Sequence, residues 1–360
     1  MTATALSTVP VWIFGAKGLL AGELLRLLDL HPALRLRGAV SRVEQNVADV
    51  HPHSRERAST CSAEKAQAAI AEVLAVGEPA AVLFALPHGE SAVAWKALRA
   101  ELGARADKLF VVDLSADFRL RDPARYAAAY GSPHPAPEEL GSFVYGLPEF
   151  RGAAISRSRR VAAPGCFATA MQLSCVPAAR AGLLDARRPW ILHGITGSSG
   201  SGVEPKPGTH HPWRHGNLWA YSLAGHRHEF ELAQALSECG MEPPIHFVAH
   251  SGPFARGIHL TCALPLARKT TIGEAQATFV QAFEGRPCVQ VLDGKVPDIR
   301  SVCASNRAQI GVHVRGDLLT VLCTIDNMVK GGAGQALQCL NLMLGLPETT
   351  GIPLAGLGVC

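Results

Sequence analysis

The chain has 360 residues, of which 48% are hydrophobic and 18% charged, enough for two domains with buried sheets, and this composition excludes a long disordered chain. Its net charge of +4 is mild and its basic residues are scattered, which excludes a nucleic-acid-binding stripe but admits a small anionic substrate or an acidic partner. No apolar run approaches the roughly 20 residues that cross a bilayer, and no basic region precedes an apolar core, so we expect a cytoplasmic protein that is not bound to a membrane.

The first predicted elements are a buried strand, a tight turn and a helix over residues 11–25. Gly15 and Gly18 in the turn let the backbone approach a pyrophosphate, and Ala21 or Gly22 permits close packing of the helix over the sheet. The pattern favours a dinucleotide-binding unit, although a plain strand-to-helix turn has the same glycines.

The second predicted strand, residues 36–40, runs into Ser41 and Arg42. An NAD-binding unit places a carboxylate about 20 residues after the glycine turn, where it binds the ribose hydroxyls. A hydroxyl and a guanidinium instead suit the 2′-phosphate of NADP. Glu44 lies close by in the sequence, and a solvated surface pair is the alternative interpretation.

Helical and strand-like patterns then alternate over residues 63–76, 80–86, 91–102 and 109–114. Such alternation predicts a parallel sheet covered on both faces. Polar loops follow two of these strands, at residues 86–89 and 113–119, and open α/β sheets bind ligands at the carboxyl ends of their strands. We therefore expect His88 and Asp117 near a ligand, with capping of the loops as the alternative.

Cys166 stands behind a Pro164-Gly165 turn and ahead of an apolar stretch that predicts a helix. A helix N-terminus stabilises a thiolate through the macrodipole and the unpaired N–H groups, which lowers the pKa of the thiol and makes it nucleophilic. The alternative is a buried packing residue, a common role of free cysteine. Ten cysteines without a C-x-x-C pair argue against a zinc module and a disulfide scaffold.

A second domain is expected to begin near Cys166, where longer strands separated by Gly- and Pro-rich loops replace the alternation. The strand-like runs predict a mixed or antiparallel sheet, which often pairs subunits, over residues 190–195, 245–249, 258–266, 309–314 and 318–325. A predicted helix over residues 331–344 packs back on the first domain. We therefore expect one domain of residues 1–164 with 327–360, and a second of residues 165–326.

Seven motifs follow one another along nearly the whole chain, and they are Gly15–Ala21, Leu86–Gly89, Asp113–Leu120, Tyr145–Glu149, Pro164–Cys166, His226–His228 and Asp326–Gln335. In this order they resemble the N-acetyl-gamma-glutamyl-phosphate reductase family. The resemblance implies an α/β fold with a Rossmann-type dinucleotide-binding domain and an α+β substrate and dimerisation domain. It further implies NADPH, reduction of an acyl phosphate to a semialdehyde through a cysteine thioester, and a homodimer or homotetramer.

The same resemblance implies roles for individual residues. Cys166 is the nucleophile, and His226 and His228 with Glu231 are the acid/base group and its orienting partner, with His226 slightly favoured as the proton donor. The positions assigned to the cofactor are Gly15, Lys17, Gly18, Leu19, Leu20, Ser41, Arg42, Pro87, Ser115 and Asn327. Those assigned to the substrate are His88, Arg119, Ser199, Gly200, His210, His211, Arg214 and Arg256. Arg256 would clamp a carboxylate, with a structural ion pair as the alternative.

Three departures from the family pattern are Leu19-Leu20 in place of Tyr-Thr, Ala163 in place of asparagine, and Lys17 in place of a small hydroxyl residue.

Residues 197–202, 209–214 and 304–306 look more like the lysine-pathway branch than the arginine-pathway enzymes. Members of that branch reduce aminoadipyl phosphate held by a small acidic amino-group carrier protein. A basic rim for the carrier would consist of Lys206, His210, His211, Arg214 and His215, with a solvated loop as the alternative.

Two other functions stay open. An aspartate-semialdehyde dehydrogenase shares the two-domain plan and the cysteine chemistry, but the His226–His228 motif counts against it. A nicotinamide-binding regulator without turnover would keep only the fold, and the presence of Cys166 together with two histidines counts against it. A metal site built from His210, His211, His226 and His228 is weakly spaced, and no metal is expected.

Overall fold

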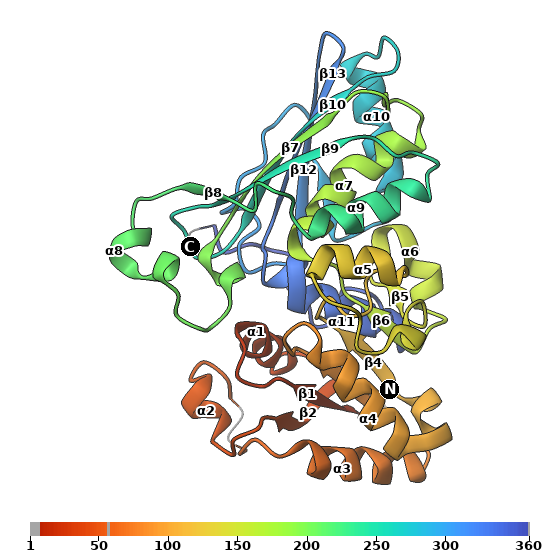
Figure 1. Cartoon of the computed structure of the whole chain (residues 1–360), viewed down its shortest axis with the longest axis vertical. Helices are drawn as coiled ribbons and strands as arrows, with labels where there is room; N and C mark the ends of the chain where they lie inside the picture. The colour runs from red at the N-terminus through yellow and green to blue at the C-terminus, as the bar shows by residue number, and fades with distance from the viewer. Residues whose placement is uncertain (1–7, 56–57, 359–360) are drawn as a thin grey trace, which may run out of the picture. The chain divides into compact units, whose positions relative to one another are not determined.

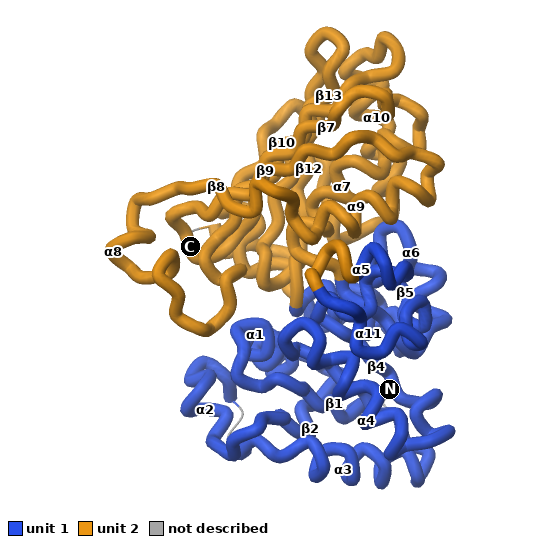
Figure 2. Tube along the Cα trace, viewed as in Figure 1, with its two compact units in different colours: residues 1–126, 132–163, 333–352 blue, residues 127–131, 164–332, 353–360 orange. Residues whose placement is uncertain are grey.

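The computed structural model describes residues 8–55 and 58–358, which divide into two compact units (Figures 1 and 2). Unit 1 consists of the described residues up to 126, residues 132–163 and residues 333–352. Unit 2 consists of residues 127–131, residues 164–332 and the described residues from 353 onward. The glycine turn after the first strand therefore belongs to unit 1, and the turn that carries Cys166 belongs to unit 2.

Unit 1 is built on a parallel sheet, in which the six strands of the described residues lie in the order β2-β1-β3-β4-β6-β5. These strands are β1 (Val9–Phe14), β2 (Leu34–Val40), β3 (Ala81–Phe84), β4 (Phe110–Asp113), β5 (Val144–Tyr145) and β6 (Arg160–Ala162). Because β1 lies between β2 and β3, the direction of the strand order reverses there. The loops that follow β1 and β3 are consequently neighbours at the carboxyl edge, where open α/β sheets bind ligands.

Helices cover both faces of this sheet (Figure 1). They are α1 (Leu19–Leu28), α2 (Val47–Val50), α3 (Ala63–Ala75), α4 (Glu90–Leu102), α6 (Pro148–Ile155) and α11 (Gly334–Met343), with the short η1 (Gly103–Lys108) and η2 (Pro137–Glu139). Ile70 of α3 and Trp95 of α4 pack with Trp12 and Phe84 of the strands, all of them buried. Each such side chain contributes about 1.5–3 kcal/mol by leaving water. The division between the units falls within α5 (Pro123–Tyr130).

Unit 2 contains a mixed sheet, in which the seven strands of the described part lie in the order β11-β12-β13-β10-β7-β9-β8. The strands are β7 (Trp190–Thr196), β8 (Trp219–Tyr221), β9 (Ile245–Ser251), β10 (Ile258–Pro265), β11 (Val289–Val291), β12 (Ala308–Arg315) and β13 (Leu318–Ile325). Two pairs, β7 with β9 and β11 with β12, are parallel, and the other described pairs are antiparallel.

Three helices, α7 (Cys166–Arg180), α9 (His228–Ser237) and α10 (Ile272–Ala282), pack on one face of the unit 2 sheet. Burial alternates along β10, so one face of the strand is in the core and the other is half exposed. The helix α7 is buried along almost its whole length, which fixes the position of its first residue, Cys166. The remaining short helices are η3 (Ser198–Ser201), η4 (Pro207–Thr209), α8 (His211–Arg214) and η5 (Val329–Ala333).

The predicted fold class and the long elements are confirmed, with boundaries that differ by a few residues. The strand expected over residues 80–86 is β3, which is shorter because its last residues already belong to a loop. The helix expected over residues 331–344 is α11, which begins at Gly334 after the wide turn η5. The sequence patterns did not reveal α9, α10 and the short strands β5, β6 and β8.

Candidate active site

The turn after β1 has the geometry of a phosphate-binding loop. Gly15 has a φ of +91°, and a Cβ atom there would lie 2.5 Å from the carbonyl oxygen of Ala85, so the turn packs directly against the end of β3. Gly18 is the N-cap residue of α1 and has no side chain to cap the first N–H groups of the helix. Lys17 and Leu19 are exposed on this turn and Leu20 is partly exposed. These features fit the pyrophosphate of a nicotinamide dinucleotide.

Arg42, predicted to bind a 2′-phosphate, follows β2 and forms an ion pair with Glu90. Its Nη2 atom lies 2.7 Å from Oε2 of Glu90, and 85% of the Arg42 side chain is exposed. An exposed pair of this kind contributes at most about 1 kcal/mol, so a phosphate can compete with the carboxylate for the guanidinium. Ser41 accepts a weak hydrogen bond from the backbone N–H of Val43, at 3.4 Å. Glu90 was not predicted from the sequence, and it comes into reach because α4 begins near the end of β2.

The loops after β3 and β4 are bound to each other by polar contacts. Nδ1 of His88, which follows Pro87, accepts the backbone N–H of Ala116 at 3.0 Å. The carboxylate of Asp117 accepts N–H groups of Gly89 and Ala92, at 2.7 and 2.8 Å, and so caps the start of α4. The capping interpretation of both residues therefore describes their observed contacts.

Asp113 at the end of β4 is fully buried, and its carboxylate accepts the hydroxyl and backbone N–H of Ser115, at 2.8 and 3.0 Å. Burial and, after it, the neighbouring charge of Asp117 raise the pKa of Asp113 to about 7. Arg119, predicted to bind substrate, is 5% exposed, and its Nε and Nη2 atoms donate to the carbonyls of Ala163 and Leu114, each at 2.8 Å. These contacts make Arg119 a support for the end of the 132–163 segment of unit 1.

The thiol turn of unit 2 brings three of the predicted catalytic residues together. Cys166 is partly exposed and is the first residue of α7, with Gly165 as N-cap. Oε2 of Glu231 accepts the backbone N–H of Gly165 at 3.1 Å. The imidazole of His228 lies so close to Gly165 that a Cβ atom at this position would collide with its Nε2. The turn is therefore bound by a carboxylate and contacted by an imidazole, both of them from α9.

Gly331 packs directly against Cys166, because a Cβ atom at position 331 would lie 2.7 Å from Cβ of Cys166. The helix start is reinforced by Thr169, whose backbone N–H and hydroxyl both donate to the carbonyl of Gly165, at 2.8 and 3.2 Å. Glycine at positions 165 and 331 thus has a steric cause in each case, since neither has a positive φ. The sequence analysis missed Gly331 as a site residue, although its place in a motif was a signal.

His226 and His228 are neighbouring imidazoles, and both are buried. Nδ1 of His226 accepts the backbone N–H of His228 at 3.2 Å, and the backbone N–H of His226 donates to Glu229 at 2.6 Å. Burial, and secondarily the charge of Arg227, lowers the pKa of His226 to about 4. The ring centroid of Tyr221 lies 5.9 Å away, and burial raises the pKa of that phenol, with the Cys166 charge as a second cause. His226 is therefore a neutral ring with its proton on Nε2.

Asn327 and Ser199, predicted for cofactor and substrate, contact each other. Nδ2 of Asn327 donates to the Ser199 hydroxyl at 2.9 Å, and its Oδ1 accepts the N–H of Gly257 at 2.7 Å. Arg256 forms a two-pronged ion pair with the fully buried Asp326, at 3.0 and 3.2 Å. The ion-pair alternative for Arg256 therefore describes its observed partner. Gly200 lies beside this cluster, and a Cβ atom on it would be 3.8 Å from Nδ2 of Asn327.

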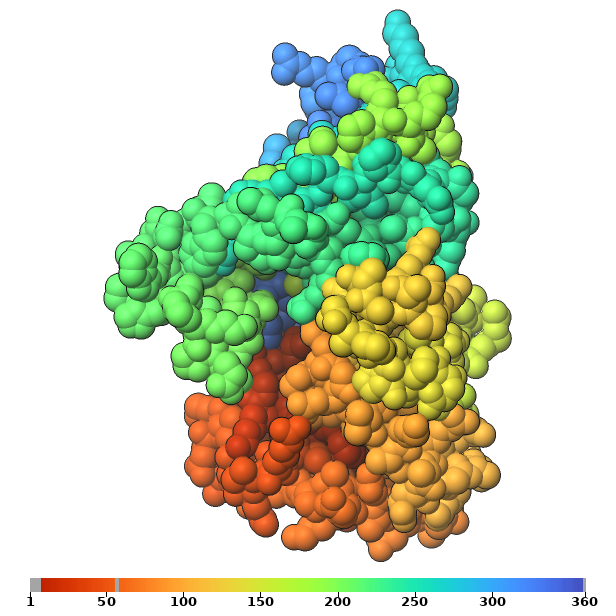
Figure 3. All heavy atoms as spheres, in the orientation of Figure 1, coloured from red at the N-terminus to blue at the C-terminus, as the bar shows by residue number. Residues whose placement is uncertain are grey.

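The segment that follows β7 lies at the surface of unit 2 (Figure 3). Lys206, His210, His211 and His215 are exposed there, as is 69% of Trp213. A cavity of about 250 Å³ is lined by Pro207, Gly208, Trp213, Asn217 and Trp219. Arg214 departs from the predicted rim: it is 8% exposed, it donates to the Ser251 hydroxyl at 2.6 Å and it lies over the Trp219 ring. It is buried because backbone carbonyls of residues 252 and 254 also accept its guanidinium.

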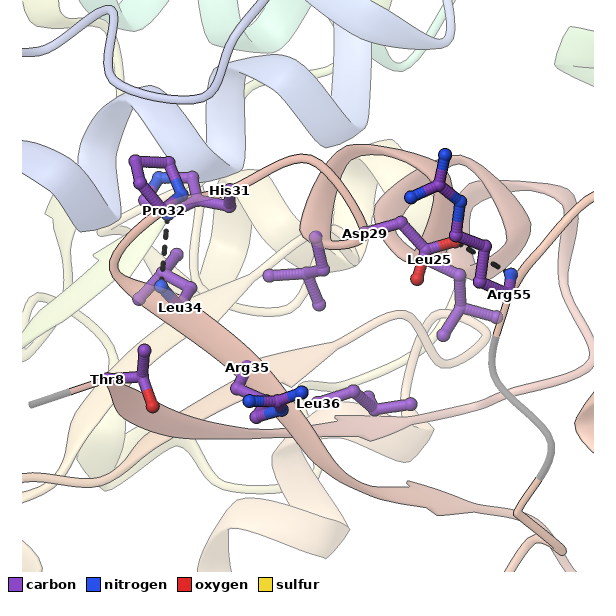
Figure 4. Close-up of a pocket in the computed structure, with 10 residues that line it drawn as sticks. Thr8, Leu25, Asp29, His31, Pro32, Leu34, Arg35, Leu36 and Arg55 are labelled. Carbon is purple, nitrogen blue, oxygen red and sulfur yellow. Dashed lines mark hydrogen bonds between the residues drawn. The ribbon is translucent and has the colours of Figure 1, made fainter.

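A second cavity, of about 560 Å³, lies in unit 1 near the amino ends of β1 and β2 (Figure 4). Its lining includes Asp29, His31, Arg35 and Arg55, and none of the predicted site residues. In Figure 4, His31 is already engaged by the backbone N–H of Leu34, and Asp29 by that of Arg55. Among the described residues, no cluster of His, Cys, Asp or Glu could hold a metal ion, and no helix has the length and apolarity to cross a membrane.

Comparisons with known proteins cover both units. Residues 10–158 match the family model of the semialdehyde dehydrogenase NAD binding domain, and residues 166–327 match that of the semialdehyde dehydrogenase dimerisation domain. N-acetyl-gamma-glutamyl-phosphate reductase of Pseudomonas aeruginosa (strain UCBPP-PA14) is 40% identical over 355 residues, which are 97% of this chain and 99% of that protein. The protein of the same name from Pseudomonas syringae pv. syringae is 39% identical over the same shares of both chains.

Solved structures with a similar fold are aspartate semialdehyde dehydrogenases. The enzyme II from Vibrio cholerae, complexed with ASA, has a TM-score of 0.65 at 15% identity and covers 94% of this chain and 99% of its own. The enzyme from Candida albicans, with NADP, has a TM-score of 0.65 at 13% identity and the same coverage. At these identities the likeness supports the fold alone.

Proposed function

The chain belongs to the N-acetyl-gamma-glutamyl-phosphate reductase family, and from this premise we propose that it reduces an N-blocked γ-glutamyl or δ-aminoadipyl phosphate to the semialdehyde with NADPH, through a thioester on Cys166. As a member of the family it is an aldehyde-forming oxidoreductase that acts on acyl phosphates and uses a nicotinamide cofactor. The single observation that carries the proposed mechanism is the thiol at the start of α7, with Glu231 and His228 of α9 both in contact with its turn.

Cys166 is the proposed nucleophile. A thiolate at the first position of a helix is stabilised by the helix N-terminus, and the long buried helix α7 supplies that field. The sulfur attacks the carbonyl carbon of the acyl phosphate, the C–O bond to phosphate breaks, and inorganic phosphate leaves with the bonding electrons. The acyl group remains on sulfur as a thioester, so one difficult step becomes two easier ones.

The dinucleotide is proposed to bind unit 1 at the turn of Gly15 and Gly18, with Ser41 and Arg42 at its 2′-phosphate. When bound, the cofactor supplies a hydride that reduces the thioester carbon. The oxygen gains a proton from the proton donor, and collapse of the hemithioacetal returns that proton to the same group, breaks the C–S bond, restores the thiolate and releases the aldehyde. N–H groups at the start of α7 are suited to stabilise the developing oxyanion.

The geometry favours His228 over His226 as the proton donor, which reverses the slight preference from the sequence. The ring of His228 covers Gly165, the neighbour of the nucleophile, whereas His226 has a pKa of about 4 and is neutral near pH 7. Glu231 binds the backbone of Gly165, so we propose that it positions the thiol turn. Similarly, Arg119, Arg256 and Asn327 are proposed to support the site through the contacts described above, in place of contacts to substrate or cofactor.

The substrate's blocking group is proposed to be an amino-group carrier protein, as in lysine biosynthesis, with the acetyl group of arginine biosynthesis as the alternative. The support is a surface segment with four exposed basic or titratable side chains and an exposed Trp213 beside a cavity of about 250 Å³. Basic groups suit an acidic carrier by electrostatic complementarity. Assembly into a homodimer or homotetramer through unit 2 is proposed from its match to a dimerisation domain.

The reaction run in reverse tests this function. The enzyme is given phosphate and NADP with either acetylglutamate semialdehyde or carrier-linked aminoadipate semialdehyde, and NADPH formation is followed by absorbance. We expect phosphate-dependent oxidation, faster with the carrier-linked aldehyde. Oxidation of the acetyl-blocked aldehyde alone would assign the chain to arginine biosynthesis and remove the carrier. No oxidation of either aldehyde would reject the proposed activity.

Replacing Arg42 with alanine tests the choice of cofactor. The substitution removes a cation that suits the 2′-phosphate, so we expect the Kd for NADPH to rise about tenfold and the Kd for NADH to stay within twofold. Both constants are measured by fluorescence titration of the free enzyme. Arg37→Ala, which removes an exposed guanidinium from β2 itself, is the control and should change neither constant. An unchanged preference for NADPH would remove Arg42 from the phosphate site.

A further inference from the structure

Two histidines outside the predicted site contact the glycine turn of unit 1 and the helix α1 that follows it. His51 and His53 follow the short helix α2, and His51 is 5% exposed. Nε2 of His51 lies 2.7 Å from the carbonyl oxygen of Ala16, within the turn. Nε2 of His53 lies 3.0 Å from the carbonyl oxygen of Gly22 in α1. Because a carbonyl oxygen only accepts hydrogen bonds, Nε2 carries the proton in both rings.

The ring of His51 also explains why position 22 is glycine. A Cβ atom at Gly22 would lie 2.6 Å from Nδ1 of His51 and 2.9 Å from Cε1. The nearest side chains to position 22 are thus the two imidazoles. Glycine is required there by these rings and not, as expected from the sequence, by close packing of the helix on the sheet. His51 therefore lies against α1 through Nδ1 and Cε1, while its Nε2 reaches the turn that precedes the helix.

The hydrogen bond to Ala16 fixes one peptide plane of the turn. The backbone N–H groups of Gly15 and Ala16 both donate to the carbonyl of Val40, at 3.2 and 3.0 Å, so the first part of the turn is bound to β2. His51 then holds the next carbonyl. In a planar trans peptide the C=O and N–H point in opposite directions, so holding the Ala16 carbonyl directs the N–H of Lys17 away from His51. Directed backbone N–H groups are what a glycine turn offers to phosphate oxygens.

The imidazole of His51 orients the Ala16 peptide without adding a charge to the site. Burial is the main cause that lowers the pKa of His51, opposed by the hydrogen bond to Ala16 and reinforced by His53. A neutral ring leaves the charge of the site unchanged and supplies one donor. Its contribution should therefore be the same for any dinucleotide with a pyrophosphate, whether or not it carries a 2′-phosphate.

We propose that His51 is a positioning residue for the nicotinamide dinucleotide, which holds the Ala16 peptide so that the turn is preformed for the pyrophosphate, and that Gly22 is required to admit its ring. The inference rests on the dinucleotide site proposed above.

The test compares His51→Gln, which keeps a donor at the reach of Nε2, with His51→Phe, which fills the space without one. For His51→Phe we expect the Kd values of NADPH and NADH to rise together, each about tenfold, because the buried Ala16 carbonyl loses its donor. For His51→Gln both should stay within about threefold of wild type. At saturating NADPH, kcat should be unchanged in both variants. The control is His313→Gln, at an exposed histidine of β12, which should change neither Kd.

A double substitution tests the role of Gly22. Gly22→Ala alone should weaken both dinucleotides because its methyl group displaces the His51 ring. In the Gly22→Ala, His51→Ala variant the methyl group has room, so binding should be no weaker than in His51→Ala alone. Wild-type affinity in a folded His51→Phe, equal losses in His51→Gln and His51→Phe, or additive losses in the double variant would each overturn the proposal. Failure of the wild-type enzyme to bind either dinucleotide would instead contradict the proposed function.

Discussion

Replacing Cys166 with serine is expected to reduce the turnover of acyl phosphate by about a thousandfold or more while the affinity for NADPH stays within twofold. A serine hydroxyl fits the same place at the start of α7, but near neutral pH it does not ionise as a thiol does, so the helix N-terminus has no anion to stabilise. The dinucleotide turn belongs to the other unit and keeps all of its contacts. NADPH oxidation, phosphate release and fluorescence titration measure the three quantities.

Cys239→Ser is the matched control for this experiment. Cys239 is also a partly exposed cysteine of unit 2, and its sulfur donates to the carbonyl of Ala235 at 3.4 Å, a bond that a hydroxyl can replace. Its substitution should leave turnover unchanged. Mass spectrometry of the wild-type enzyme with acyl phosphate and no NADPH should find the acyl group on the peptide that contains Cys166. Substantial turnover by Cys166→Ser would exclude covalent catalysis at this position.

The long helices and strands were predictable because their residue patterns are local and follow from which side chains are buried. The strand β1 and the helix α1 form a buried run, two turn glycines and an apolar helix, and each feature is local. The short strands β5 and β6 contain two and three residues, too few for a pattern, and they exist because β6 pairs with β4 and β5 pairs with β6. The helix α10 was missed although Thr271 caps its first turn, since the exposed Ile272 and Val280 obscure the apolar period of its buried face.

The site was predictable as a set of residue types but not as a set of contacts. Arg214 and Arg119 were assigned to substrate from the family resemblance and Arg256 as a clamp for a carboxylate, and their observed partners within the chain include backbone carbonyls or a buried carboxylate. Those partners are distant in the sequence: Asp326 lies 70 residues from Arg256. No local pattern encodes such a pairing, so the sequence indicates the chemistry of a guanidinium but not what satisfies it.

The glycines of the two turns also show that contacts between distant segments cannot be predicted from local sequence patterns. At Gly15 the backbone itself requires glycine, because φ is positive, and this requirement can be predicted from the turn motif in the sequence. Gly22, Gly165 and Gly331 have ordinary backbone angles, and glycine is required there by the ring of His51, the ring of His228 and Cβ of Cys166. These steric causes join segments far apart in the chain. They mark two places, the thiol turn and the dinucleotide turn, where an imidazole or a thiol must approach the backbone.

His228→Asn is expected to lower kcat by about a hundredfold, the usual contribution of a positioned proton donor, whereas His226→Asn should lower it by less than about tenfold. The first substitution removes the ring that covers Gly165, and asparagine still fills part of the space. The second removes an acceptor for the backbone N–H of His228, which asparagine can partly replace. Both variants should bind NADPH as the wild type does and should keep a thiol that reacts with iodoacetamide.

The pH dependence separates the two histidines further. The folded-state pKa of His226 is lowered from 6.5 to about 4, so its neutral form contributes stability that is fully present above pH 6.5 and is lost as the pH falls toward 4. His226 therefore does not change its charge between pH 7 and 9, and His226→Asn should leave the shape of the kcat profile in that range unchanged. His228→Asn should lower kcat throughout that range, because the group that delivers the proton is gone. A large loss with an altered profile in His226→Asn, and no loss in His228→Asn, would assign the proton to the other ring.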